Sequence, residues 1–439
     1  MRNKSIVPIA TFRALFQELI PSAFVCGLLL GCGLRRRRPP TVTGAELIQG
    51  LVFHVVAEAG TLAQHVKELT GKDITDGALA QRRALLPPAV FEQLMQAALK
   101  PKAQLEKHPE AFYQGLRLCG VDGSLFSVTN TPQVKKQMRK ARSRRGRAAF
   151  PKVGVAVMLE LGLHNPLAVA LGANGESEMV LAQQVWAAQP EQSLMINDRY
   201  YGVPEVLVNL PLEGERHVLV RVKKNLKRRL LQVYPDGSAW VEIRSGEKTR
   251  RVREILARVQ RGGRGPFTTV RLWTSLLDWR QHPASQLVAL YGRRWEQELF
   301  YKELKVDMRS TPYLQSHTPL TAMQEIAALI LAYAVLVDYR VEAARVGEVG
   351  VLRISFLKTL HVVQGLWQFL ELSADLLGPE QVRLVVSRAL RQIADRAMAK
   401  RRARSCPRAL RQPVSRWPRL RKNTYRTGQP QYSVGKIYV

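Results

Sequence analysis

The sequence predicts an α/β protein with a helical N-terminal domain, a mixed sheet flanked by helices, and a β-rich insertion. Apolar residues recur at helical spacing as far as about residue 105. From about residue 110, strand-like runs alternate with helical segments, and after residue 222 turn signals and β-branched residues return. We therefore expect a basic helical domain, the first part of a core, the insertion, the helical remainder of the core and a basic, weakly structured tail, at residues 1–105, 106–222, 223–286, 287–390 and 391–439.

The helical domain has recognisable start signals. Residues 45–56 and 91–99 carry apolar side chains at helical spacing. Thr43 stands where an N-cap is expected, and Glu46 three positions later completes a capping box. An apolar run at residues 23–34 is shorter than the roughly 20 residues that cross a bilayer. Charges follow this run, whereas in a signal peptide they precede it, so we expect a buried helix.

The charge balance points to a polyanionic partner. Lys and Arg number 67 against 35 for Asp and Glu, a formal net charge of +32. A chain this basic is typical of proteins that bind nucleic acid. The 4 cysteines lack any paired metal-ligand spacing. We expect them to be reduced thiols of a cytoplasmic protein that associates with the nucleoid.

The middle of the chain predicts a mixed sheet that carries two aspartates. Three strand-like runs, GLRLCGVDGSLFSV, PKVGVAVMLEL and PLAVALG, are followed by a helix from Glu178 to Gln189 with Ser177 as its N-cap. A strand SLMIND, a short helix and the strand HVLVRV complete the order. This order of elements is that of a ribonuclease-H-like fold. In that fold one carboxylate lies on the first strand and another at the end of the fourth, where Asp122 and Asp198 stand.

A third acidic position lies on a predicted helix at residues 291–305, YGRRWEQELFYKELK. At about 100° per residue, the side chains of Tyr291, Arg294, Glu298 and Lys305 fall within one arc of about 60°. A carboxylate in such a stripe can hold a metal ion, while cations and a phenol hold phosphates. Glu296 and Glu303 point to other faces, so we expect alanine variants of these two residues to leave the activity of the stripe intact. The stripe consists of Tyr291, Arg294, Glu298 and Lys305, joined by Lys302.

Each of these patterns alone has an ordinary structural explanation. Arg294 and Glu298 form an i,i+4 pair of the kind found on solvated helix faces. Asp122-Gly123 is typical of a turn, and Asp198-Arg199 of a helix cap or surface ion pair. It is the combination, in the right order along the chain, that favours a catalytic site.

The spacing Tyr291-x2-Arg294-x3-Glu298-x6-Lys305 resembles the Tyr-Arg-Glu-Lys signature of the bacterial insertion-sequence-4 family of DDE transposases. VDGSLFSVTNTP and INDRYYG are similar to the family's two aspartate motifs. The resemblance runs from about residue 12 to the start of the basic tail and is weakest at both ends. It implies a ribonuclease-H-like (retroviral-integrase-like) catalytic core in which Asp122, Asp198 and Glu298 are catalytic and bind two Mg²⁺ ions, with Mn²⁺ able to substitute.

The resemblance also implies where DNA is held. Tyr291, Arg294, Lys302 and Lys305 would bind phosphate beside the cut strand. Trp273 is a weaker candidate for stacking on a displaced base, and a core position in a small sheet is the favoured explanation for it. The further candidates are basic residues of the N-terminal domain and of the insertion: Arg35, Arg36, Arg37, Arg38, Lys223, Lys224, Lys227 and Arg228.

The function implied is that of a transposase of an insertion sequence, which binds terminal inverted repeats and moves the element by DNA cleavage and strand transfer. A homodimer assembled on two double-stranded DNA ends is expected. Two alternatives stay open at this point: a ribonuclease-H-like nuclease that cuts without joining, and a domesticated DNA-binding protein without catalysis. Short inverted repeats bounding the coding sequence would favour the transposase.

Overall fold

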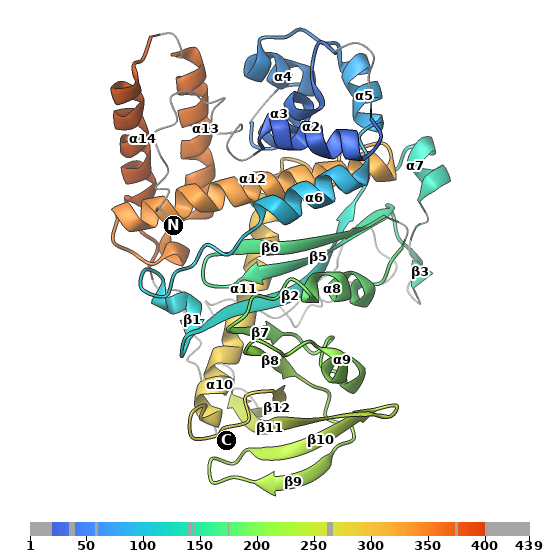
Figure 1. Ribbon diagram of the computed structural model, residues 1–439, viewed down its shortest axis with the longest axis vertical. Helices are drawn as coiled ribbons and strands as arrows, with labels where there is room; N and C mark the ends of the chain where they lie inside the picture. The colour runs from blue at the N-terminus through green and yellow to red at the C-terminus, as the bar shows by residue number, and fades with distance from the viewer. Residues whose placement is uncertain are drawn as a thin grey trace, which may run out of the picture.

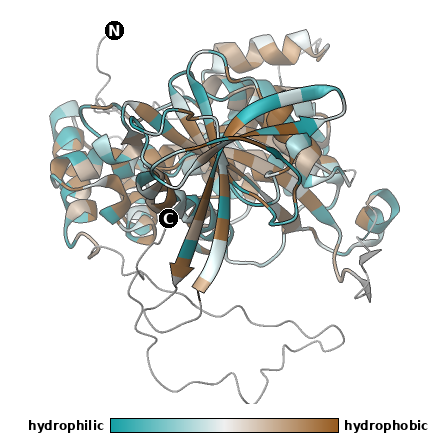
Figure 2. Ribbon diagram, turned by 90° about the horizontal axis from the view of Figure 1, so that it is seen from below, coloured by the Kyte–Doolittle hydropathy of each residue, from teal (hydrophilic) through white to brown (hydrophobic). Residues whose placement is uncertain are grey.

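The computed structural model describes residues 20–34, 40–57, 60–138, 140, 142–143, 146–173, 175–260, 267–373 and 376–399. Within these residues the chain forms a helical part, a large mixed sheet that extends away from the helices (Figure 1), and a separate two-stranded sheet. Figure 2 shows apolar, brown segments on the strands that cross the middle of the molecule, with apolar and polar residues mixed along the surrounding helices. The predicted α/β class is therefore confirmed.

Five strands form the half of the sheet nearest the helices. They run in the order β6-β5-β2-β7-β8 across the sheet. β2 pairs antiparallel with β5 and parallel with β7; β5–β6 is antiparallel and β7–β8 parallel. This is the arrangement of a ribonuclease-H-like core, as predicted. The bounds are β2 Leu116–Ser127, β5 Lys152–Glu160, β6 Asn165–Gly172, β7 Ser193–Asn197 and β8 Arg216–Arg221.

Two helices connect these strands on one face of the sheet. α8, Glu178–Trp186, lies between β6 and β7 in the chain, and α9, Pro204–Asn209, lies between β7 and β8. Ser177 caps α8 as predicted, since its Oγ accepts a hydrogen bond from the Val180 amide. The helix ends three residues earlier than the predicted Gln189. Every residue of β7 is buried, as expected for a parallel strand covered on both faces.

The predicted insertion continues the same sheet. Its last strand pairs antiparallel with β8, and the four strands form a meander that ends at β9. Asp236 and Gly237 turn the chain between the first two strands, with Gly237 at a φ of +80° that favours glycine. The bounds are β9 Arg229–Val233, β10 Ala239–Ser245, β11 Lys248–Gln260 and β12 Phe267–Thr274.

The helical part combines elements from both ends of the described chain. The Thr43–Glu46 capping box forms as predicted. The first helix forms too, but only Val25 and Leu29 are buried on it, so the expectation of a buried helix is wrong. The bounds are α2 Ser22–Gly31, α3 Gly44–His54, α4 Leu62–Thr70, α5 Asp76–Ala84, α6 Pro88–Ala98, α13 Phe356–Leu372 and α14 Pro379–Ala394.

One long helix, α12, Pro319–Val346, separates this bundle from the sheet (Figure 1). It packs against α3 and α6 on one side and against β6 and β5 on the other. Among the described residues it is the one helix long and apolar enough to cross a membrane, yet 78% of its most apolar window is buried inside the protein. It is therefore a core helix, as predicted.

The helix that carries Glu298 is divided into four segments. α10 and α11 follow one another along one direction in Figure 1. A 3₁₀ turn, Gly292–Arg294, separates them, and a π-helical turn, Glu303–Asp307, follows α11. These turns change the angle per residue assumed for a uniform helix. The bounds of α10 and α11 are Ala284–Tyr291 and Trp295–Lys302; the remaining short elements are η1 Pro109–Ala111, β1 Phe112–Tyr113, α7 Pro132–Gln137, β3 Arg142–Ser143, β4 Gly146–Arg147 and η4 Val351–Arg353.

Candidate active site

Two of the predicted carboxylates lie at the same level of neighbouring parallel strands. Cys119 of β2 is in register with Met195 of β7, and Asp122 and Asp198 each stand three residues further along the same direction. Successive side chains of a strand alternate between faces. Leu118 and Leu194 pack in the core on the α12 side, so both aspartates project from that face.

A buried asparagine ties these two strands together where their backbone pairing ends. Asn197, the last residue of β7, is 1% exposed. Its Oδ1 accepts a hydrogen bond of 3.0 Å from the Val121 amide. Asn197 and Val121, which this bond joins, directly precede Asp198 and Asp122. Asn197 therefore fixes the spacing between the two aspartates, a role that the sequence pattern did not reveal.

The surroundings of Asp122 disfavour its charged form. Burial and the nearby carboxylates of Glu178 and Asp198 raise the pKa of Asp122 to about 7, against the opposing effects of the Gly123 amide and Arg294. The Gly123 amide donates a 2.9 Å hydrogen bond to Asp122 Oδ1. A buried carboxyl among other carboxylates is the condition that a bound cation relieves.

Helix α11 lies along β2 and runs in the same direction. An added Cβ at Gly120 would lie 2.7 Å from the Gln297 side chain, and the Tyr301 hydroxyl donates to the Asp122 carbonyl at 2.8 Å. From Gln297 to Tyr301 the helix rises about 6 Å, close to the roughly 6.6 Å that the strand spans from Gly120 to Asp122. The matched spacing places Glu298 beside the part of β2 that carries Asp122.

The third predicted carboxylate is held by the predicted arginine. Arg294 Nη2 donates to Glu298 Oε1 at 2.7 Å. Burial alone would lower the pKa of Arg294, but Glu298, Tyr291 and Asp122 outweigh burial and raise it. Arg294 therefore lies within electrostatic range of two of the three carboxylates. The stripe predicted from helical spacing is thus partly formed.

Tyr291 lies at the edge of this group. Burial raises its pKa to about 12, with Asp198 adding to the rise and Arg294, Arg221 and Arg199 opposing it. A phenol with this pKa stays protonated at neutral pH, so it is available as a hydrogen-bond donor to phosphate oxygen. Because Asp198 and Arg294 both influence this pKa, the phenol lies within electrostatic range of both groups.

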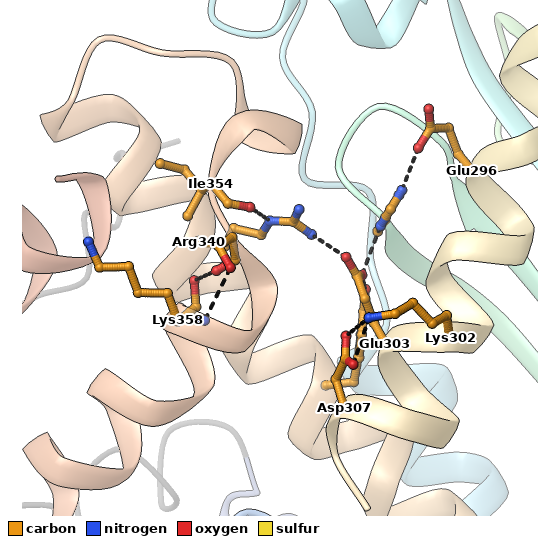
Figure 3. Close-up of polar contacts among 11 residues, drawn as sticks. Glu296, Lys302, Glu303, Asp307, Arg340, Ile354 and Lys358 are labelled. Carbon is orange, nitrogen blue, oxygen red and sulfur yellow. Dashed lines mark hydrogen bonds and ion pairs between the residues drawn. The ribbon is translucent and has the colours of Figure 1, made fainter. Parts of the chain in front are cut away.

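Lys305 reaches β2, whereas Lys302 does not. Lys305 Nζ donates to Ser124 Oγ at 3.1 Å and to the Leu125 carbonyl at 2.9 Å, two and three residues beyond Asp122. Lys302 Nζ instead contacts both carboxylate oxygens of Asp307 at 2.7 Å, and the two side chains point toward one another in Figure 3. Lys302 ends the regular turn of α11 that begins at Glu298, and the π-helical turn brings Asp307 within its reach; phosphate binding by Lys302 stays a prediction.

The insertion candidates divide into exposed and buried residues. Lys223, Lys224 and Lys227 are exposed on the loop after β8. Arg228 is exposed as well but pairs with Glu254 at 3.1 Å. Trp273 is fully buried, and its indole N–H donates to Glu254 at 2.9 Å. Trp273 is thus a core residue, the explanation favoured from the sequence, and the weaker candidate role in base stacking is wrong. The candidates Arg35, Arg36, Arg37 and Arg38 lie outside the described residues.

Sequence reasoning missed a fourth carboxylate near Asp122. Glu178, the first residue of α8, accepts a 2.8 Å hydrogen bond from the buried Tyr201 hydroxyl. A Cβ at Gly123 would lie 2.3 Å from Glu178 Cγ, so only glycine allows this approach. The one signal in the sequence was an acidic residue after an N-cap serine, which is ordinary in any helix.

The donor set fits a hard divalent cation, although the ligands are not gathered into one cluster. Carboxylate oxygens are the ligands that Mg²⁺ prefers. The crowding of Asp122 by Glu178 and Asp198 is the electrostatic state that such a cation relieves. Within the part of the chain that the structure describes, no three acidic, histidine or cysteine side chains converge closely enough to hold a metal ion as they stand. Asp122, Asp198 and Glu298 thus fit a divalent cation in their chemistry, and Glu298 is engaged by Arg294.

Comparison with known families decides the identity of this arrangement. Residues 114–335, about half of the chain and including all three carboxylates, match the family model described as "Transposase DDE domain". The chain belongs to the DDE transposase family. This family comprises polynucleotidyl transferases with endonuclease activity that depend on divalent metal ions, and the family predicted from the motifs is confirmed.

Two curated relatives come from Escherichia coli (strain K12). "Transposase InsG for insertion sequence element IS4" is 28% identical over 235 residues, which are 51% of this chain and 52% of that protein. "Putative transposase InsZ" is 25% identical over 158 residues, 36% of this chain and 52% of that protein. The chain thus spans about half the length of the curated relatives it matches. Both relatives are named as transposases.

A solved structure shows a weak overall likeness to this DDE transposase. It is titled "Cryo-EM structure of piggyBac transposase synaptic complex with hairpin DNA (SNHP)" and covers 88% of this chain and 86% of its own. The TM-score is 0.45 and the sequence identity 12%. A likeness at this level supports no inference, and the fold assignment depends on the strand order.

Proposed function

We propose that this DDE transposase moves a bacterial insertion sequence by binding its terminal inverted repeats, cleaving the DNA and transferring the strands. The observation that carries the proposal is the placement of Asp122 and Asp198 at one level of two adjacent parallel strands, facing the helix that carries Glu298. The net charge of +32 supports double-stranded DNA as the partner.

The proposed metal is Mg²⁺, bound as two ions by Asp122, Asp198 and Glu298, with Mn²⁺ able to replace it. Such ions, when bound, activate the attacking oxygen and stabilise the leaving oxygen of a phosphodiester. The protein's part is to keep the carboxylates in place. Asn197 fixes the distance between the two strands, and Arg294 orients the Glu298 carboxylate.

The remaining signature residues are proposed to hold the cut strand. Tyr291, a protonated phenol near Asp198, would donate to a phosphate oxygen. Lys305, anchored beside Ser124, would place an ammonium group on the same side of β2. Holding two reactants in register can supply roughly 7–11 kcal/mol toward a second displacement. This is the requirement that distinguishes strand transfer from hydrolysis.

We extend the proposal to assembly and place of action. Residues 1–105 and 223–286 would contact the ends of the element, with Lys223, Lys224, Lys227 and Arg228 touching phosphates. One subunit per DNA end implies a homodimer on DNA. The protein would act in the cytoplasm on the nucleoid.

A strand-transfer assay with pre-cleaved ends tests the proposal. Ends taken from the inverted repeats that bound the coding sequence, each with a free 3′-hydroxyl, should be joined to target DNA in Mg²⁺. Products limited to nicks and free ends would favour a nuclease without joining activity. Binding without any cleavage would favour a domesticated DNA-binding protein. Either outcome would contradict the proposed function.

A further inference from the structure

A buried charged cluster lies under the helix that carries Glu298. His164, at the turn between β5 and β6, has no exposed surface. Its Nε2 lies 2.8 Å from Glu296 Oε2, and its Nδ1 lies 2.9 Å from Glu303 Oε2. One imidazole thus bridges two carboxylates of the catalytic helix. Sequence reasoning had treated both glutamates as dispensable.

The hydrogen-bond geometry fixes the charge of this imidazole. An ionised carboxylate can only accept, so His164 donates from both ring nitrogens and carries a positive charge. Burial alone would lower the pKa of His164, but Glu303 and Glu296 outweigh burial and raise it. Burial likewise opposes ionisation of Glu303, yet His164 and Arg340 hold the pKa of Glu303 at about 2. The cluster is therefore a set of paired charges.

Helix α12 supports the far side of the cluster. Glu303 also accepts from the Tyr333 hydroxyl and from Arg340 Nη1, the latter at 3.4 Å. Figure 3 shows Arg340 pointing toward Glu303 and donating to the Ile354 carbonyl. Arg340 is fully buried. Glu303 is therefore held from two directions, by the sheet through His164 and by α12.

The positions of Glu296 and Glu303 on the helix define how the helix is rotated about its axis. Glu296 and Glu303 are seven residues apart, which is close to two turns, so they project from one face. Glu298 lies about 200° around from Glu296. A residue that bonds both glutamates resists rotation and sliding of α11, and so fixes the direction in which Glu298 points.

The backbone of His164 is consistent with a position held for this purpose. Its φ of +55° lies in the left-handed region, which residues other than glycine adopt rarely. Such a conformation persists where the surroundings impose it. The two carboxylates supply that restraint, since they bind the ring at both ends.

We propose that His164 is a positioning residue for the active site: through Glu296 and Glu303 it sets the orientation of α11 so that Glu298 completes the carboxylate triad with Asp122 and Asp198. This inference deepens the proposed function and rests on it. His164 does not touch the reacting atoms. It acts at a distance, through the helix.

The test compares His164→Gln and Glu296→Gln with the matched control Glu160→Gln in the full-length protein. Glu160 is also fully buried and accepts from Arg117, from the Lys102 and Ala103 amides and from Asn165. Among the described residues, the hydrogen bonds and ion pairs of Glu160 do not include a residue of α11. All three variants lose one buried charge or charged partner. A general loss of stability should therefore affect them alike.

Three quantities are measured: the DNA affinity in Ca²⁺, the Mg²⁺ concentration for half-maximal cleavage, and the rise in Tm on adding Mg²⁺. For His164→Gln and Glu296→Gln we expect the required Mg²⁺ to rise about 10- to 100-fold, as for other groups that orient metal ligands. The Mg²⁺-induced rise in Tm should shrink in parallel. DNA affinity should stay within about twofold, because phosphate contacts set it. Glu160→Gln should keep the wild-type Mg²⁺ requirement.

An unchanged Mg²⁺ requirement in folded His164→Gln would overturn the proposal, as would an equal change in Glu160→Gln. If His164→Gln does not fold, the half-buried Glu296→Gln decides on the same criteria. If none of these variants folds, the cluster is purely structural and the proposal is wrong. A failure of the proposed function is distinguishable, because the wild-type protein itself would then show no Mg²⁺-dependent cleavage.

Discussion

Replacing Gly120 by alanine should disable the active site while leaving the protein folded. An added Cβ would lie 2.7 Å from Gln297 Nε2 and 2.9 Å from the Ile196 carbonyl oxygen, both inside the 3.4 Å at which ordinary contacts begin. The Gln297 amide, at the end of a flexible side chain, must give by about 0.7 Å. The Ile196 carbonyl must give by about 0.5 Å; it is backbone of β7, two residues before Asp198. Overpacking of this kind costs roughly 1–3 kcal/mol of stability.

The effect on activity follows from the displacement. Active-site groups tolerate about 0.5 Å of misplacement, and a shift of about 1 Å costs roughly 100-fold in rate. We expect Mg²⁺-dependent cleavage by Gly120→Ala to fall about 10- to 100-fold, measured on supercoiled DNA that carries the element's ends. DNA affinity, measured in parallel, should not change.

Two further variants sharpen this test. Adding Gln297→Ala removes the closest contact at no cost in hydrogen bonds, because neither amide atom of the buried Gln297 has a partner among the described residues. The double variant should regain part of the activity. Gly365→Ala, in α13 with no atom within 4 Å of the added Cβ, should be fully active and up to about 1 kcal/mol more stable. Wild-type cleavage by Gly120→Ala would refute the placement of α11 on β2.

Two more predictions concern charge. DNA affinity should fall as salt rises, along a straight line in log K against log salt. Deleting residues 400–439, which are basic and contain no acidic residue, should make that slope less steep. The deletion starts after Met398 because the amide and carbonyl of Met398 form hydrogen bonds with Arg353. An unchanged slope would mean that the tail does not contact phosphates. Burial, with His65 and Arg83, lowers the pKa of His54 to about 4. The unfolded chain therefore binds the extra proton between about pH 6.5 and 4, and stability is lost as the pH falls through that window. In His54→Asn the drop in Tm between pH 7 and pH 5 should be smaller, and an equal drop would contradict the burial of a neutral His54.

Local sequence patterns were sufficient to predict those features whose physical cause lies within one helix or one strand. Thr43 and Ser177 cap their helices because an N-cap side chain bonds the backbone two or three residues ahead. Asp122 and Asp198 share a face because side chains alternate along a strand and the strand order brings β2 and β7 together. These are the features that the sequence could predict.

Contacts between distant segments were beyond the reach of the sequence. His164 meets Glu296 and Glu303 only because the β5–β6 turn packs against α11, more than 130 residues later in the chain. Glu303 is therefore buried, and its alanine variant is not the neutral control that helical spacing suggested.

Two other contacts were not foreseen from the sequence, one for a local reason and one because of tertiary structure. A π-helical turn that no spacing rule anticipates allows Lys302 to reach Asp307. Trp273 of the insertion is a core residue because β12 pairs directly with β8. In both cases the residue type is compatible with DNA contact, but in the structure the side chain contacts another part of the protein.

The catalytic carboxylates themselves provide the most direct test of the account. Asp122→Ala, Asp198→Ala and Glu298→Ala are assayed for cleavage of supercoiled DNA bearing the element's ends in Mg²⁺, beside Glu92→Ala, which removes an exposed carboxylate on α6. We predict that each of the three abolishes cleavage with DNA affinity nearly unchanged, because metal binding depends on carboxylates and affinity on contacts to phosphates, and that Glu92→Ala cuts like the wild type. Cleavage by any of the three at the wild-type rate would contradict the assignment of the triad.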